Sequence, residues 1–173
     1  KLENGVKEIH LPGFFTAVCI KGKLFVRKRQ RCDFVEDKFF SGNFVSKDIN
    51  VPGTTEIGFR GLCLTTKLVS KKGIDFYSTK SNKAYLDYDK TGSDIKVRVF
   101  RPGDRFVPLG MKGTKKLKSF FIDEKVPRDQ RKSIPLLTST NDDIIWVYEK
   151  RIGERYRVTD KSTKVMVVEG TIA

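Results

Sequence analysis

The sequence contains few of the residues on which most catalytic and metal sites depend. His10 is its only histidine, which excludes a triad with a histidine base and a histidine-containing zinc site. The three cysteines are odd in number and too far apart for zinc-binding pairs, so they indicate ordinary thiols in a reducing cytoplasm. No stretch of about 18 apolar residues is present, which excludes a membrane-spanning helix. These absences indicate a cytoplasmic protein with no catalytic or metal site in these residues.

Two segments come close to ligand-binding motifs but lack essential positions. Residues 103–114 contain glycines and lysines, yet no Gly-Lys-Ser/Thr follows at the spacing of a nucleotide-binding loop. Asp87, Asp89 and Gly92 look like the start of a calcium loop, but Arg98 stands where a bidentate glutamate is needed. We therefore expect neither a nucleotide loop nor a calcium site.

Positive charge is what the sequence has in excess. The formal net charge is +14, and residues 101–132 hold ten lysines and arginines against four acids. Such a surplus favours a phosphate-bearing partner, above all a nucleic acid. A solvated basic surface and a match to an acidic neighbouring domain are the alternatives. An anionic membrane is less favoured, because the cations stand among glycine and proline and not along an amphipathic helix.

Within this segment a glycine-containing turn leads into a predicted helix. Gly110 and Gly113 would let the backbone approach a phosphate, and the first N–H groups of the helix would point toward it. For Arg101 and Arg105 the alternative is an ion pair with Asp104, and Arg131 could instead fix a second short helix. The predicted RNA-binding residues are Arg101, Arg105, Lys112, Lys115, Lys116, Lys118, Arg128 and Arg131.

The hydrophobic pattern predicts an α+β fold that is rich in strands. A period of two predicts strands at 15–20, 23–29, 55–60, 64–70, 74–78, 83–88, 94–100, 135–138, 144–148, 155–159 and 164–168. Lys21 and Gly22 have the form of a hairpin turn. In the strand at 94–100, Lys96 and Arg98 alternate with apolar residues and should face solvent.

The pattern changes to a helical period in the second half of the chain. Leu117, Phe120 and Phe121 lie on one face of a predicted helix from about residue 115 to 124, with Thr114 as its N-cap. Pro127 suits the first turn of another short helix near 128–132. The composition shifts near residue 93, which predicts a β-rich lobe at 1–93 and a second lobe at 94–173.

Seven short stretches resemble one family closely. They are RPGDRF at 101–106, PLGM at 108–111, KKLK at 115–118, FFID at 120–123, KVP at 125–127, IPLL at 134–137 and IWV at 145–147. Together they resemble the C-terminal domain of bacterial tRNA(Ile)-lysidine synthetase over roughly residues 83 to 168. Lys150 departs from the family, which usually has glycine there. The chain begins at Lys1, without methionine or an apolar leader, and is interpreted as a C-terminal fragment of a longer protein, with residues 1–173 forming one RNA-binding region.

The resemblance implies a part in a larger enzyme. Members of the family use ATP to adenylate the wobble cytidine of a minor isoleucine tRNA and then join lysine to it. Their ATP loop, Ser-Gly-Gly-x-Asp-Ser, does not occur in this sequence, so ATP and Mg²⁺ would belong to an N-terminal catalytic domain and this fragment would hold no cofactor.

The resemblance also implies how this part would act. The C-terminal domain would grip the tRNA acceptor stem, and its fold would be the mixed α/β arrangement with packed sheets that the phenylalanyl-tRNA synthetase β subunit shares. A homodimer is left open. The alternative is a basic module for interdomain or dimer assembly, without direct contact to RNA.

Overall fold

The computed structural model describes residues 7–11, 15–20, 23–28, 46–57, 61–72 and 80–172. Contacts divide the chain into two compact units, Lys1–Gly42 and Asn43–Ala173. In the first unit, β1 (Lys7–Leu11), β2 (Phe15–Ile20) and β3 (Lys23–Lys28) form an antiparallel sheet in that order. Ile20 pairs with Lys23, which confirms the predicted hairpin.

The second unit contains two larger antiparallel sheets. One has the order β13 (Arg151–Ile152), β12 (Ile144–Val147), β11 (Leu136–Ser139), β8 (Ile95–Arg98) and β4 (Lys47–Ile49). The other has the order β5 (Gly53–Glu56), β6 (Leu62–Ser70), β14 (Lys164–Ile172) and β7 (Lys83–Asp87). Smaller elements are β9 (Arg105–Phe106), β10 (Lys115–Lys116), α1 (Tyr88–Thr91), α2 (Leu117–Asp123) and the 3₁₀ turns η3 (Arg131–Ser133) and η4 (Glu154–Tyr156).

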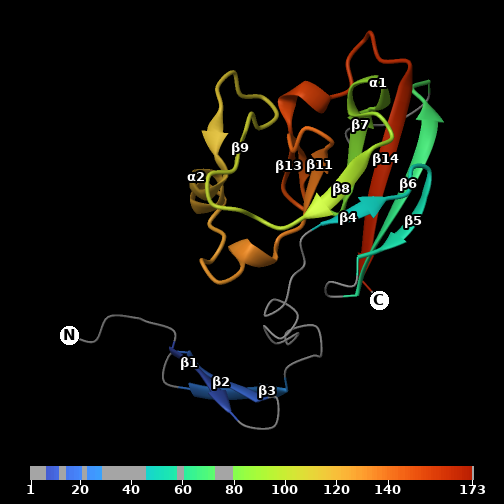
Figure 1. Ribbon diagram of the computed structural model, residues 1–173. Coiled ribbons are helices and arrows are strands. Elements are labelled where there is room, and N and C mark those ends of the chain that lie inside the picture. Colours follow the sequence, from blue (N-terminus) through green and yellow to red (C-terminus); the bar gives the residue numbers. More distant parts are fainter. Residues whose placement is uncertain are drawn as a thin grey trace. The chain divides into compact units, whose positions relative to one another are not determined.

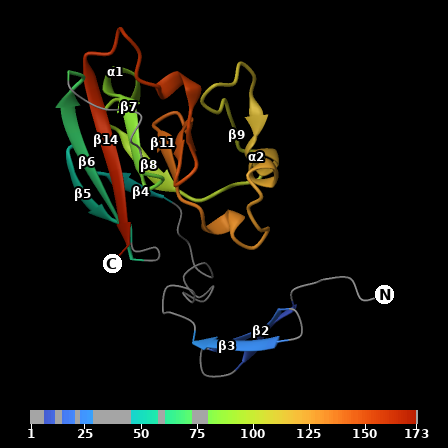
Figure 2. The ribbon, with the colours of Figure 1, turned by 180° about the vertical axis from the view of Figure 1, so that it is seen from behind.

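The five-stranded sheet is the middle layer of this unit. Both views place it between the four-stranded sheet and the segment that holds β9 and α2 (Figures 1 and 2). All four residues of β12 are buried, as a strand covered on both faces requires. Trp146, at the centre of β12, is 2% exposed and belongs to the core, as the sequence predicts.

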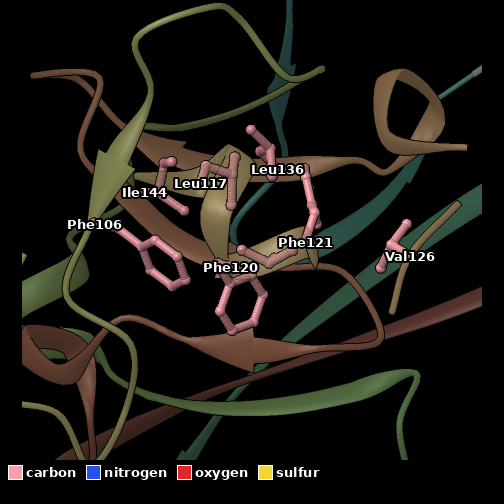
Figure 3. Packing of buried hydrophobic residues seen from close by; sticks show 8 residues of the cluster. Phe106, Leu117, Phe120, Phe121, Val126, Leu136 and Ile144 are labelled. Carbon is pink, nitrogen blue, oxygen red and sulfur yellow. The ribbon is translucent and has the colours of Figure 1, made fainter. Parts of the chain in front are cut away.

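The helix α2 anchors the outer layer through its aromatic residues. Phe120 lies edge-on to Phe106 of β9, with ring centroids 5.1 Å apart. Phe121 and Leu117 are fully buried in the same cluster, which includes Leu136 of β11 (Figure 3). The spacing of these residues along α2 brings them to one face, so the helix and β9 are fixed to the middle sheet by one shared core.

The strand-rich α+β class with packed sheets is confirmed, whereas several boundaries differ from the prediction. Strand β5 begins at Gly53 and ends at Glu56, earlier than predicted. Residues 155–159 are not a strand: η4 ends at Tyr156 and irregular chain follows. The predicted strand at 74–78 lies outside the described residues. The expected division near residue 93 does not coincide with the contact units, because β14 pairs with β6 and β7 across it.

The helical predictions need three corrections. The helix over 115–124 is real but begins at Leu117, because Lys115 and Lys116 are paired in β10. Its N-cap is Lys116, without a side-chain capping bond, and not Thr114. Ile122, on the opposite face of α2 from the core, is 52% exposed. The second helix shrinks to the single turn η3. Among the described residues, no helix is long and apolar enough to cross a membrane.

Candidate nucleic-acid interface

The candidate interface is residues 101–118, which we name the basic loop. Within it, β9 and β10 pair in antiparallel register, so that Lys116 stands opposite Arg105 and Lys115 opposite Phe106. Phe106 is buried in the α2 core, whereas Arg105 and Lys116 are exposed. Side chains directly opposite each other in such a pair have Cβ atoms about 5 Å apart. The loop therefore presents two cations side by side on its solvent face.

The base of the basic loop is held by a buried ion cluster centred on Arg98. Its guanidinium donates two hydrogen bonds of 2.9 Å to the two carboxylate oxygens of Asp104 and one of 2.6 Å to Asp142. A fourth bond, of 3.0 Å, goes to the carbonyl oxygen of Val99. The Arg98 side chain is 2% exposed and Asp104 10% exposed. Asp104 also accepts a bond of 2.7 Å from the Arg101 N–H, which fixes the first turn of the loop.

The charge of Arg98 is stabilised where it lies. Burial alone would lower its pKa, but the hydrogen bonds and negative charges of Asp104 and Asp142 outweigh burial and raise it. Arg98 therefore stays cationic and pairs bidentately with Asp104, the geometry that a planar guanidinium favours. The prediction that Arg98 faces solvent is wrong. Its two acids lie 6 and 44 positions away in sequence, so no local pattern signals the burial.

The tip of the basic loop, around Leu109 and Gly110, is hydrogen-bonded to the chain around η4. Leu109 donates its N–H to the carbonyl oxygen of Ile152 at 2.9 Å, and Glu154 donates its N–H to Val107 at 2.8 Å. The Gly110 N–H donates to the Glu154 carboxylate at 2.8 Å. The loop is thus braced at its base and at its tip, and Glu154 is a positioning residue that the sequence pattern does not identify.

The predicted cations differ in how they are engaged. Lys115 pairs with Asp123 of α2, and Arg101 pairs with Asp142 at 3.5 Å. Arg131 donates from Nε to the Val126 carbonyl at 3.0 Å and thereby fixes the chain after α2. The others are exposed and form no ion pair within the described part of the chain; they are Arg105, Lys112, Lys116, Lys118 and Arg128.

Backbone donors at the start of α2 are less free than the sequence suggests. The Leu117 N–H donates to the Asp104 carbonyl oxygen at 2.8 Å, and the Gly110 N–H is taken by Glu154. Gly110 has a φ of +85°, a conformation that glycine adopts without strain. Side-chain cations, more than backbone N–H groups, are therefore what the basic loop offers to an anion.

Comparison with known sequences agrees with the motifs. The family model of the TilS substrate C-terminal domain matches residues 95–169. A tRNA(Ile)-lysidine synthase of Caldanaerobacter subterraneus subsp. tengcongensis is 36% identical over 95% of this chain and 33% of its own length. That of Geobacter sulfurreducens is 53% identical over 51% of this chain and 18% of its own length. The chain thus spans about a third or less of the curated relatives that it matches.

Comparison with solved structures shows the same fold. A crystal structure of a TILS C-terminal domain aligns with a TM-score of 0.60 and 21% identity, over 73% of this chain and 97% of that one. Its near-complete coverage shows that most of this chain has a known domain fold. Residues 95–169 thus match the family of the TilS substrate C-terminal domain, which confirms the resemblance carried by the motifs.

Proposed function

We propose that this chain is the tRNA-binding C-terminal region of a tRNA(Ile)-lysidine synthase and that its basic loop grips the acceptor stem of the minor isoleucine tRNA. The observation that carries the proposal is the pairing of Arg105 with Lys116 on a braced loop. Like charges placed directly opposite each other destabilise a strand pair. Neither residue has an ion-pair partner in the described part of the chain, and Lys112 and Lys118 lie in the same loop. Phosphate groups would relieve this repulsion.

A helical RNA stem fits such a surface better than a small anion does. The cations are spread along a loop and do not converge on one point, so they match a row of phosphates. Double-stranded RNA is recognised largely by its shape and through phosphate and 2′-hydroxyl contacts. The binding energy would come from those contacts, and its use would be to hold the substrate in place for a distant reaction.

The reaction itself would take place elsewhere in the full-length enzyme. The relatives are named as tRNA(Ile)-lysidine synthases, and their remaining length would supply the catalytic domain that uses ATP, with Mg²⁺, to join lysine to the wobble cytidine. ATP and Mg²⁺ would bind in that catalytic domain. In this proposal the enzyme acts in the cytoplasm, and the partners of this chain are the tRNA and that catalytic domain.

The proposal is tested by removing the opposed cations together. Two exposed phosphate contacts contribute about 0.5 to 1 kcal/mol each, so Arg105→Ala with Lys116→Ala should weaken binding of the minor isoleucine tRNA by about 5- to 30-fold. The control is Lys67→Ala with Lys164→Ala, which removes the same charge from the four-stranded sheet, on the other side of the middle layer (Figure 1). A hairpin that contains only the acceptor stem should compete with the whole tRNA.

The rival function is a basic module for interdomain or dimer assembly. It predicts equal binding of tRNA and a heparin-like polymer, together with no difference between the two double variants. The proposal would then be withdrawn. An acceptor-stem hairpin that fails to compete would refute the choice of stem while leaving tRNA binding intact.

A further inference from the structure

A second cationic surface adjoins the basic loop. It is a groove of about 930 Å³ between the edge strands of the two large sheets, with β7 on one side and β13 on the other. Its lining contains one acid, Asp160, and six cations, and we name it the basic groove. The cations are Lys71, Lys80, Lys83, Lys150, Arg151 and Arg157. They come from four separate stretches of sequence, which is why no motif reveals them.

The cations of the basic groove are neutralised only in part. Lys80 and Lys150 are exposed and form no ion pair within the residues that the structure describes. Lys71 donates to the Thr159 carbonyl at 2.8 Å and to Asp160 at 3.3 Å. The remaining three pair with acids outside the lining, at 3.5 Å for Lys83 with Glu169 and Arg151 with Glu124, and at 2.9 Å for Arg157 with Glu154. Exposed pairs of this kind contribute little and can exchange for phosphate.

The basic groove also offers apolar and aromatic surface. Tyr85 of β7 is half-buried in its lining, with the Lys83 ammonium 5.7 Å from the ring centroid. Leu109, at the tip of the basic loop, lines it too and is 39% exposed. Cations that follow a backbone and an aromatic face on which a base can stack are the features of single-strand binding sites. A duplex, whose bases are already stacked, would have no use for the aromatic face.

Direct bonds join the basic groove to the basic loop. Glu154 accepts the Gly110 N–H on one carboxylate oxygen and pairs with Arg157 through the other, at 2.8 and 2.9 Å. Leu109 is fixed by its bond to Ile152, which lies in the same lining. A polyanion that leaves the tip of the loop therefore meets the groove next.

We infer that the basic groove binds a single-stranded segment of RNA that continues from the duplex held on the basic loop. This inference rests on the proposed function, because it takes the duplex on the loop as given. The groove admits one strand, Lys80 and Lys150 meet its phosphates, and Tyr85 and Leu109 contact an unstacked base.

The test compares two RNA hairpins of the same stem, one blunt and one with a short single-stranded extension. The chain should bind the extended hairpin about tenfold more tightly, the gain that two exposed phosphate contacts, by Lys80 and Lys150, provide. Lys80→Ala with Lys150→Ala should bring the ratio of the two affinities close to one while binding of the blunt hairpin is retained. The matched control is Lys132→Ala with Lys164→Ala, which removes two exposed lysines that do not line the groove and should keep the ratio.

The outcomes separate this inference from the proposed function. Equal affinity of the unaltered chain for both hairpins overturns the groove and leaves the loop in place. The inference is also overturned if Lys80→Ala with Lys150→Ala keeps the affinity ratio of the unaltered chain. It is overturned as well if the control variant loses that ratio to the same extent. Failure to bind either hairpin refutes the proposed function, and the inference falls with it.

Discussion

Removing the carboxylate of Asp104 should loosen the whole basic loop. Asp104→Ala deletes both 2.9 Å bonds to Arg98 and the 2.7 Å bond to the Arg101 N–H. Breaking a buried ion pair costs about 3 to 5 kcal/mol, because the remaining charge is left uncompensated. Asp142 still accepts a 2.6 Å bond from Arg98, so we expect the lower end, about 3 kcal/mol, and a fall in Tm on the order of 10 °C.

Urea unfolding followed by the fluorescence of Trp146, the only tryptophan, measures this cost. The control is Asp142→Ala. The Asp142 side chain is 54% exposed and makes one bond to Arg98, so this change should lower the free energy of unfolding by about 1 to 2 kcal/mol. tRNA binding should weaken with Asp104→Ala even where the chain stays folded, since the opposed cations lose their support. An unchanged urea midpoint, or a smaller cost than that of Asp142→Ala, would refute the bracing role of Arg98.

Three further changes probe the core, the loop brace and the alkaline limit. Phe120→Ala should cost about 3 to 5 kcal/mol in urea unfolding, because Phe120 is 3% exposed against Phe106; a cost under about 1 kcal/mol would contradict the shared core. Gly153→Ala would place a Cβ 2.7 Å from a backbone oxygen and should cost about 1 to 3 kcal/mol and weaken tRNA binding, whereas Gly113→Ala, with open space around it, should be neutral in both assays. Burial and then the charge of Glu149 raise the pKa of Tyr148 from 10.0 to about 12, so its stabilisation is complete below pH 10 and is lost as pH rises toward 12. Unfolding free energies across that range should fall less steeply for Tyr148→Phe, and equal slopes would refute this.

The sequence predicts those parts of the fold that depend on local periodicity. The alternation of apolar residues locates β2, β6, β8 and β12 to within a few residues, and the spacing of Leu117, Phe120 and Phe121 locates α2. The predicted strand at 155–159 fails because its Tyr156 is buried at the end of a 3₁₀ turn and not on a sheet face. The local pattern of apolar residues cannot distinguish burial on a sheet face from burial at the end of a 3₁₀ turn.

The sequence predicts the composition of the interface but not the contacts that hold it in place. The excess of cations in residues 101–132 is visible in the sequence, and the motifs identify the family. Two features depend on how α2 and the middle sheet meet. They are the pairing of Lys115 with Asp123 and the burial of Arg98 against Asp104 and Asp142. These contacts join residues 6, 8 and 44 positions apart, at no common period, so only the fold reveals which cations are left for a ligand.

If unpaired cations of the basic loop bind the phosphates of an RNA stem, the affinity for tRNA must depend on salt concentration, and a salt titration measures this dependence. Binding of the chain to the minor isoleucine tRNA releases about one counterion for each phosphate that is contacted. With about four to six contacts, log K should fall against log salt concentration with a slope of about −3 to −5, and Arg105→Ala with Lys116→Ala should reduce the magnitude of that slope by about 2. A slope near zero, or one that this double variant leaves unchanged, would show that these cations do not contact phosphates.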